Sequence, residues 1–545
     1  MNGAELLVRE LQARGIDCVF TLTGNGLAPL MAACGRLGMR VIDTRNEQAA
    51  AYQADGIGRM TRRLGVCAVS SGVAHVNALS GVANAWYDGS PMLLITGGSE
   101  SDTRGKGHFQ DMDTAGLAAP LCKYCTYVSR VDQLISHMDM AIEAATTGRP
   151  GPVHLTVPVD VLVSETTAQL SGKTTAAVVS GGPPDAAAVA EAAHVLASSA
   201  RPFVVAGSGV FYADAASELA SLARALGAPV VVPIWDRGAV EQPLPEFVGV
   251  LGAASGQARI LPDADAVLLV GARVDYRVGY LEPFAVRPDA QVVRISADAD
   301  ELTQGVEPHV AVLGDPRRAM EGIRQRLAAR GHVADGAWLA EARRRHREFL
   351  AGQPWRAALT APSGMTTGSD IIEAIREVLT DQTYFLIDGG NIGQWVHMAM
   401  ADRYPGRWMT CGRSAVIGWG IPTAAAVRAY DPEAPIVLLS GDGSATFTIA
   451  ELECAARQQL PFVAVVADDS AWGIVLSGIR QAGGPSVGAE LGPIDFVKVA
   501  EGLGCRGLRV DEPSGIADAI RRGLTETAVP TVIHVPMTTG GPADR

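Results

Sequence analysis

The feature that most restricts the fold of this chain is a repeating alternation of short apolar runs and helical patterns. The apolar runs end in Gly, Ser or Asp, and the alternation continues along most of the 545 residues. This order is typical of βαβ units, in which helices join parallel strands and cover the sheet. Aromatic residues make up only 5 % of the chain, and small aliphatic residues suit buried parallel strands. We therefore expect an α/β fold.

Two segments interrupt this alternation. Residues 165–188 are rich in Thr, Ser, Gly and Pro, and residues 351–370 follow a highly charged helical stretch. Both compositions are typical of linkers. They divide the chain into an N-terminal domain (1–165), a middle domain (185–345) and a C-terminal domain (368–540). We expect each domain to contain a mostly parallel sheet flanked by helices.

The charge of the chain restricts its partners. The formal net charge is −13 and the pI is near 5.3, which argues against nucleic acid and against an anionic membrane surface. The first 20 residues predict an amphipathic helix leading into a strand, not a signal peptide. No apolar stretch approaches the roughly 20 residues of a membrane span. We expect small-molecule substrates rather than a nucleic acid or a membrane.

The eight cysteines lie scattered through a long chain, mostly in apolar segments. This distribution is typical of reduced thiols, and we therefore expect a cytoplasmic protein. Cys122 and Cys125 form a C-x-x-C pattern, for which a redox or zinc role is an alternative. No second pair follows, so ordinary packing is the favoured interpretation.

Acidic residues follow two strand-like runs of the C-terminal domain. Asp442 follows "PIVLLS" within G-D-G, and Asp469 ends "FVAVVADD". One crossover helix between these strands would make them neighbours, with both acids at the same edge of the sheet. Hard oxygen ligands from both acids, a backbone carbonyl and phosphate oxygens would form an octahedral Mg²⁺ site. A simple tight turn is the alternative for G-D-G alone, but the second acid at this spacing favours the metal site.

In these residues the sequence resembles the thiamine-diphosphate (ThDP) enzymes of the acetolactate synthase and benzaldehyde lyase group. Their signature is G-D-G followed, some two dozen residues later, by paired asparagines. The resemblance implies that Asp442 and Asp469 bind Mg²⁺ by side chain and Ala471 by its carbonyl. It also implies that Gly441, Gly443 and Ser444 hold the diphosphate. This chain has Asp468 and Asp469 where the group usually has two asparagines, so we expect tighter metal binding and a weaker pull on the diphosphate.

A second match lies in residues 41–59, which resemble the R-H-E-x-A-A stretch of the same group. From the residues alone, Asn46 is a plausible N-cap and Glu47 an acid favoured in the first helical turn. The resemblance implies that Glu47 bonds the aminopyrimidine ring of the cofactor and promotes proton removal from thiazolium C2. Asn46 replaces the usual histidine, so a proton relay through that position is absent.

Other segments continue the resemblance in the same order along the chain. It implies that Asn77 and three residues of "DGGN" contact the cofactor, that Gln110 of "GHFQ" reaches the active centre, and that the backbone of Ala415 accepts from the pyrimidine amino group. The three residues are Gly389, Gly390 and Asn391. Ile417 falls at the bulky position that bends the cofactor into a V, with ordinary core packing as the alternative.

The middle domain offers a weaker signal. Residues 201–210 and 265–280 each read as a strand followed by glycine. The second stretch resembles one that contacts flavin in acetolactate synthases, yet relatives without flavin keep similar residues. FAD is therefore the less favoured alternative to a middle domain without a cofactor.

The substrate pocket is where the sequence departs most from the group. Asn25 and Gly26 stand where benzaldehyde lyases carry a histidine, and the adjacent histidine pair of simple 2-oxoacid decarboxylases is absent. His75 either faces the cofactor or is a structural histidine. Further pocket candidates, each equally consistent with core packing, are Trp395, Cys411, Trp472, Ile474 and Leu476. Without acid–base histidines, transfer to a second carbonyl is favoured over release of an aldehyde.

The resemblance implies a ThDP- and Mg²⁺-dependent carboligase like acetolactate synthase, acting on a 2-oxoacid donor and a carbonyl acceptor. The first alternative is an acyloin or 2-hydroxyacyl lyase of the benzaldehyde lyase type. A non-catalytic ThDP-binding paralogue is a second alternative, against which Glu47 argues. The resemblance also implies a homodimer or homotetramer, in which Glu47 of one chain meets the metal site of another.

Overall fold

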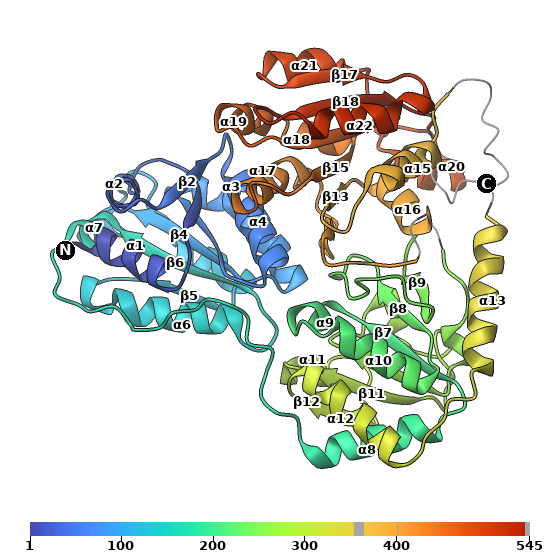
Figure 1. Cartoon of the computed structure of the whole chain (residues 1–545). Coiled ribbons are helices and arrows are strands. Elements are labelled where there is room, and N and C mark those ends of the chain that lie inside the picture. Colours follow the sequence, from blue (N-terminus) through green and yellow to red (C-terminus); the bar gives the residue numbers. More distant parts are fainter. Residues whose placement is uncertain (255, 354–364, 400–401, 540–545) are drawn as a thin grey trace.

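Three six-stranded sheets form the framework of the molecule (Figure 1). The computed structural model describes residues 1–254, 256–353, 365–399 and 402–539. Within the three sheets, neighbouring strands are parallel, as between β1 and β3, β7 and β10, and β15 and β16. Helices flank each sheet (Figure 1). The expected three-domain α/β fold is confirmed.

The N-terminal sheet has the strand order β2-β1-β3-β4-β6-β5. Its strands are β1 (Cys18–Leu22), β2 (Arg40–Asp43), β3 (Gly65–Val69), β4 (Met92–Gly98), β5 (Tyr124–Tyr127) and β6 (Pro152–Pro158). Its helices are α1 (Gly3–Ala13), α2 (Ala28–Leu37), α3 (Glu47–Thr61), α4 (Val73–Asp88), α5 (Thr114–Ala118), α6 (Leu134–Thr146) and α7 (Val159–Val163). Helix α1 begins with a capping box formed by Asn2 and Glu5, so the helix predicted at the start of the chain is confirmed.

The middle sheet has the order β12-β11-β10-β7-β8-β9. Its strands are β7 (Pro202–Ala206), β8 (Val230–Pro233), β9 (Phe247–Leu251), β10 (Ala266–Val270), β11 (Gln291–Ser296) and β12 (Val310–Leu313). Its helices are α8 (Ala186–Ser198), α9 (Ser208–Tyr212), α10 (Ala216–Leu226), α11 (Ala299–Thr303) and α12 (Pro316–Ala329), followed by α13 (Ala337–Ala351). Helix α13 runs along the side of the molecule toward the C-terminal domain (Figure 1).

The C-terminal sheet has the order β14-β13-β15-β16-β18-β17. Its strands are β13 (Tyr384–Asp388), β14 (Trp408–Thr410), β15 (Ile436–Gly441), β16 (Val463–Asp468), β17 (Arg506–Arg509) and β18 (Thr531–Pro536). Its helices are α15 (Gly368–Val378), α16 (Gly390–Ala399), α17 (Gly420–Tyr430), α18 (Asp442–Phe447), α19 (Glu451–Arg457), α20 (Gly473–Gln481), α21 (Phe496–Gly502) and α22 (Ile516–Leu524). The helix predicted between β15 and β16 is thus two short helices.

The N-terminal and C-terminal domains share one apolar core. Helix α3 packs against α17, and a Cβ atom added to Gly56 would lie only 2.6 Å from the Thr423 side chain. This close approach requires glycine at position 56, because any larger side chain would push the helices apart. Cluster members from both domains include Ala50 and Ala54 on one side and Ala424 and Val427 on the other.

The two predicted linkers differ in how much of them the structure describes. Residues 166–185 carry no helix or strand, in agreement with the composition of that segment. Of the second linker, residues 354–364 lie outside the described residues.

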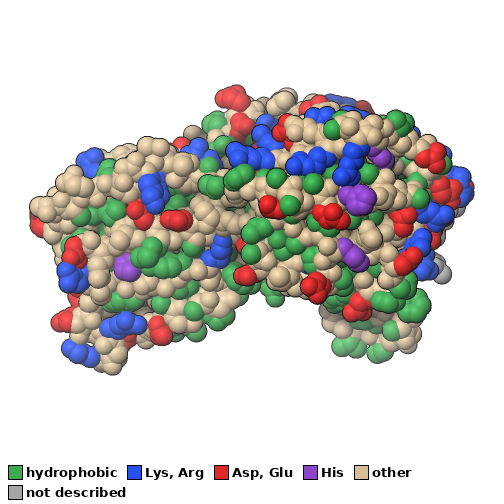
Figure 2. Space-filling view, turned by 90° about the horizontal axis from the view of Figure 1, so that it is seen from below, with side chains coloured by type: hydrophobic (Ala, Val, Ile, Leu, Met, Phe, Trp, Pro, Cys, Tyr) green, Lys and Arg blue, Asp and Glu red, His purple; other side chains and the backbone are tan. Residues whose placement is uncertain are grey.

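In the described part of the chain, no helix is both long and apolar enough to cross a bilayer. On the face seen in Figure 2, basic side chains lie among acidic ones.

Candidate functional site

A cavity of about 290 Å³ lies at the carboxyl ends of β13, β15 and β16 in the C-terminal domain. Strands β15 and β16 are direct neighbours, with Gly441 paired to Ala467, so the predicted adjacency of these strands is confirmed. Asp442 and Asp469 follow these ends and both line the cavity. The other predicted site residues that line it are Gly389, Gly390, Asn391, Cys411, Ala415, Ile417, Gly441, Gly443, Ser444, Ala471, Trp472 and Ile474.

The two adjacent acids of "VADD" have different partners. Asp468 accepts a hydrogen bond from the Ser470 backbone N–H and pairs with His534 Nε2 at 2.8 Å. Burial alone would raise the pKa of Asp468, but these contacts hold it below its ordinary value. Asp469 instead accepts from Asn391 Nδ2 at 3.1 Å. Only the second acid of the pair therefore lines the cavity, while Asp468 is hydrogen-bonded to His534 outside it.

Asp442 and Asp469 form a buried pair of like charges. Burial and the charges of Asp469 and Asp468 raise the pKa of Asp442 to about 7, and burial also raises the pKa of Asp469. A cation between the two carboxylates would remove this repulsion. The described residues contain no group of three metal-binding side chains. A divalent ion here would take two carboxylates, the Ala471 carbonyl and ligand phosphate oxygens, a donor set that suits Mg²⁺.

Glycines shape the cavity wall for a close ligand. A Cβ atom on Gly443 would lie 2.5 Å from the Trp472 ring, and one on Gly389, where φ is +135°, would lie 3.1 Å from the Gly441 nitrogen. Gly441 itself faces open space, with no atom within 4 Å of an added Cβ. An anion can therefore approach the backbone at Gly441, and the site fits a diphosphate.

The loop between β14 and α17 is held from two sides. Buried Asp388 accepts hydrogen bonds from the N–H groups of Gly418 at 3.1 Å and Gly420 at 2.9 Å, and Thr448 Oγ1 donates to the Gly418 carbonyl at 2.6 Å. Ala415 in this loop has a left-handed φ of +53°. These contacts fix Ala415 and Ile417 at the cavity wall. The bond from Thr448 also accounts for the break between α18 and α19, because Thr448 leaves helical geometry to make it.

The predicted residues of the N-terminal domain form a separate group. Asn46 caps α3, accepting from the Gln48 N–H at 2.8 Å, and the next residue, Glu47, accepts from Asn77 Nδ2 at 3.0 Å. Gln110 has a left-handed φ of +57° and accepts from Ser71 Oγ at 3.4 Å. Within one chain, no described residue of the N-terminal domain lines the C-terminal cavity.

Comparison with known protein families gives a match in each of the three domains. Three family models match the chain in the order of its domains. "Thiamine pyrophosphate enzyme, N-terminal TPP binding domain" matches residues 1–117, the central domain of the same family matches 189–323, and its C-terminal TPP binding domain matches 388–535. The chain belongs to the thiamine pyrophosphate enzymes. The resemblance to the ThDP enzymes of this group is therefore confirmed.

Curated relatives of this thiamine pyrophosphate enzyme carry two kinds of name. The chain is 27 % identical over 539 residues to a probable acetolactate synthase large subunit of Methanocaldococcus jannaschii, covering 96 % of this chain and 90 % of the relative. It is 28 % identical over 563 residues to 2-hydroxyacyl-CoA lyase 2 of Mus musculus, covering 96 % and 87 %. The corresponding lyase of Homo sapiens is 28 % identical over 546 residues, covering 93 % and 85 %.

Five predicted pocket residues do not line the cavity. His75 is fully buried in the N-terminal domain, where its Nδ1 lies 2.8 Å from Thr96 Oγ1 and its ring lies 4.8 Å from that of His154. The other four are Asn25, Gly26, Trp395 and Leu476.

These four residues have structural contacts of their own. The Asn25 carbonyl accepts from Ser70 Oγ at 2.6 Å, and Gly26 packs against the backbone of Gly98. Trp395 and Leu476 are 6 % and 2 % exposed and belong to apolar clusters. Trp395 and Leu476 therefore have the surroundings of core residues, as the alternative interpretation of each predicted.

The cavity also contains residues that the sequence did not indicate. Val475 and Met537 line it. Val475 lies between the pocket candidates Ile474 and Leu476, and Met537 directly follows β18. Trp235 comes from the middle domain, and no motif of the sequence points to it.

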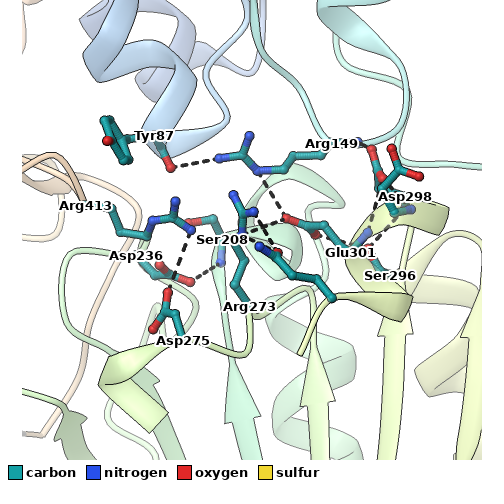
Figure 3. Close-up of polar contacts among 12 residues, drawn as sticks. Tyr87, Arg149, Ser208, Asp236, Arg273, Asp275, Ser296, Asp298, Glu301 and Arg413 are labelled. Carbon is teal, nitrogen blue, oxygen red and sulfur yellow. Dashed lines mark hydrogen bonds and ion pairs between the residues drawn. The ribbon is translucent and has the colours of Figure 1, made fainter. Parts of the chain in front are cut away.

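A second cavity lies where the three domains meet (Figure 3). Its volume is only about 50 Å³, room for roughly four water molecules. Arg149 Nε lies 3.1 Å from Glu301 Oε1, while Arg149 also donates to the Tyr87 carbonyl at 2.8 Å. Arg273 approaches the same Glu301 oxygen at 3.9 Å. The ion pair of Arg149 with Glu301 connects the N-terminal and middle domains across the cavity.

Proposed function

We propose that the protein is a ThDP- and Mg²⁺-dependent carboligase that joins a 2-oxoacid donor to a carbonyl acceptor. The observation that carries this proposal is the buried pair Asp442 and Asp469 beside a glycine-lined cavity. In this proposal both acids and the Ala471 carbonyl hold Mg²⁺. Gly441, Gly443 and Ser444, with the DGGN residues Gly389, Gly390 and Asn391, hold the diphosphate.

When bound, ThDP supplies a nucleophilic carbon and takes up the electrons released as a carbon–carbon bond breaks. The protein residues orient it and move protons. In the proposal, the backbone of Ala415 accepts from the pyrimidine amino group and Ile417 supports the bend of the cofactor. Glu47 holds and moves a proton at the pyrimidine ring, Asn77 orients Glu47, and Gln110 contacts the substrate.

The proposal requires two copies of the chain. Glu47 does not reach the cavity of its own chain, so a second copy supplies it, in a homodimer or homotetramer. Exposed apolar side chains surround Asn77 and Gln110: Val73 is 60 % exposed, Val76 43 % and Phe109 65 %. Burial of these side chains against a partner would stabilise the assembly.

Carboligation is favoured over aldehyde release because Asn25 and Gly26 stand where benzaldehyde lyases carry a histidine, and the adjacent histidine pair of simple 2-oxoacid decarboxylases is absent. Protonation and release of an aldehyde would need such an acid, whereas addition to a second carbonyl forms a carbon–carbon bond instead. The names of the relatives support a second candidate, cleavage of an acyloin or 2-hydroxyacyl substrate. The same residues would hold the cofactor for either reaction.

The test is to incubate the purified protein with pyruvate, ThDP and Mg²⁺ and to measure CO₂ and condensation products by mass spectrometry. The proposal expects CO₂ together with an acyloin product, with or without an added aldehyde. Cleavage of an acyloin or 2-hydroxyacyl-CoA without CO₂ from any 2-oxoacid would favour the second candidate. If neither activity were detected, a non-catalytic ThDP-binding protein would be the remaining candidate.

Three further parts of the proposal depend on the whole chain. We place the domain boundaries at 1–165, 185–345 and 368–540. All eight cysteines are free thiols, which supports a cytoplasmic location. The enzyme works without FAD in this proposal, and purified protein should therefore show no flavin absorption.

A further inference from the structure

Trp235 reaches the cofactor cavity from another domain. It lies in the loop after β8 of the middle domain, and it is the only described residue of that domain that lines the C-terminal cavity. Its side chain packs against the apolar cluster that includes Cys411 and Trp419. Trp235 lines the same cavity as Ala415 and Ile417.

The backbone at Trp235 is strained. Its φ is +70°, in the left-handed region, where a bulky side chain is a clear outlier. Such conformations persist only where the surroundings enforce them, and they cluster at functional sites. Ala415 and Ser470, two other non-glycine residues in this region, also lie at or beside the cavity wall. The strain at Trp235 therefore indicates a functional role for its side chain.

The two following residues enforce this conformation. Asp236 accepts from the Ser208 N–H at 3.0 Å (Figure 3) and forms a buried ion pair with Arg277. Arg237 is buried and donates to the carbonyls of Arg59 at 3.0 Å and Trp408 at 2.9 Å. The side chain of Arg237 thereby joins all three domains directly beside Trp235.

The loop is fixed to the C-terminal domain as well. Val240 and Tyr404 exchange two backbone hydrogen bonds of 3.1 and 2.9 Å, and Arg237 also donates to the Gly406 carbonyl. The segment that follows Tyr404 leads through β14 to Cys411. The loop that carries Trp235 is therefore held on both sides and cannot move away without breaking buried contacts.

We propose that Trp235 is a specificity-determining residue that limits the size of the substituent on the reacting carbonyl of the substrate. This inference depends on the proposed function, because it takes the Ala415 and Ile417 end of the cavity as the place where the substrate reacts. A rigid, apolar wall admits a short substituent and excludes a longer one by overlap. The chain would thus prefer donors with short side chains.

The test variant is W235G. Glycine adopts a left-handed φ without strain, so W235G removes the indole and keeps the loop geometry. The matched control is Y280G. Tyr280 also has a left-handed φ, +54°, lies in the same domain and does not line the cavity. Both variants introduce glycine at a strained position, but only one enlarges the cavity.

The measurement compares graded ligands of three to eight carbons, as 2-oxoacids and as acyloins. Binding to the ThDP- and Mg²⁺-loaded protein is measured by calorimetry, and turnover is measured separately. W235G should shift the ratio of long-chain to short-chain affinity and kcat/KM by at least about tenfold, with ThDP affinity unchanged. In Y280G, affinity and kcat/KM should depend on chain length in the same way as in the unaltered protein.

The outcomes separate the two proposals. Identical chain-length ranking in W235G and the unaltered protein would overturn the role of Trp235, whatever the reaction. A shifted ranking among acyloins, without turnover of any 2-oxoacid, would support Trp235 and overturn the carboligase proposal. The proposal that Trp235 limits substituent size would also be overturned if the unaltered protein and W235G bound no ligand of either series, or if W235G lost ThDP binding.

Discussion

Glu47 is a single side chain on which the proposed chemistry depends. It sits in the first turn of α3 and accepts a hydrogen bond from Asn77. E47Q keeps the shape of the side chain but cannot carry the proton, so we expect kcat to fall by about 10²–10⁴. Steady-state kinetics with pyruvate and ThDP would measure this, with cofactor affinity little changed.

The control for E47Q is E453Q, which removes the same charge from a surface acid paired with Arg45 and Arg457. Exposed pairs contribute little, and Glu453 does not line the cavity, so activity should stay near that of the unaltered protein. Full activity in E47Q would contradict the role given to Glu47.

His75 makes the stability of the N-terminal domain depend on pH. Burial lowers its pKa from 6.5 to about 4, so the unfolded chain binds this proton more readily than the folded one. The contribution of His75 is complete above about pH 6.5 and is lost as pH falls toward 4. At pH 5 the loss should be about 2 kcal/mol.

The measurement is the thermal midpoint of unfolding at pH 7.5 and pH 5. H75Q retains an amide that can bond Thr96 and removes one titrating group, so its midpoint should fall less between these pH values. The remaining fall belongs partly to His154, whose pKa burial also lowers. An equal fall in H75Q and the unaltered protein would show that His75 does not titrate as described.

Not every side chain of the site was predictable. The spacing of Asp442 and Asp469 indicated the buried pair, because strand ends at one sheet edge follow from chain order. Which acid of "VADD" lines the cavity could not be predicted from the sequence, since Asp468 pairs with His534 of β18, 66 positions along the chain. The burial of His75 likewise depends on Thr96 and His154, which the fold alone brings to it.

At the scale of elements, the packing of α3 on α4 positions Glu47 relative to Asn77. The two helices meet at Gly81, where an added Cβ would lie 2.4 Å from the Ala51 Cβ. G81V should therefore destabilise the protein by about 1–3 kcal/mol and lower activity further by moving Asn77. Denaturant unfolding and kinetics would measure the two effects.

Gly478 in α20 provides the matched control, because an added Cβ there meets no atom within 4 Å. G478A should be neutral or stabilise by about 0.5–1 kcal/mol. If G81V were as stable and as active as G478A, the close packing of α3 and α4 would not be what positions Glu47.

Elements were predictable where a continuous apolar run marked them. The apolar runs at residues 435–440 and 462–468 correspond to β15 and β16, and similar runs at 383–388 and 531–536 correspond to β13 and β18. Strands β14 and β17 were not predicted, because three residues at β14 and the sequence RGLR at β17 carry no such run. These strands form because the edges of β13 and β18 offer unpaired backbone groups.

At the scale of the whole molecule, the proposal places each active site between two chains. E47Q and D442A each remove one half-site, so each variant alone should be inactive. Mixing the two after mild dissociation should restore part of the activity, because mixed assemblies contain one intact pair of half-sites. No recovery from assemblies shown by native mass spectrometry to be mixed would contradict a shared site.

The whole-molecule arrangement was only partly predictable. Two linker-like segments indicated three domains, and the family resemblance implied a site shared between chains. The three-domain junction at Arg237 could not be predicted, because Arg237 donates to the backbone carbonyls of Arg59 and Trp408, more than a hundred positions away. Every residue type has such a carbonyl, so the sequence does not mark these partners. For the same reason Trp235 carried no sequence signal, although the strained loop places it in the cavity.

The most direct test of the account is a calorimetric titration of the protein with ThDP, with Mg²⁺ present and with Mg²⁺ removed by chelation, repeated in D469A. The account predicts saturable binding with Mg²⁺ and a loss of affinity of at least about tenfold when the ion or Asp469 is removed. Binding of ThDP with the same affinity in all three conditions, or no binding with Mg²⁺ present, would contradict it.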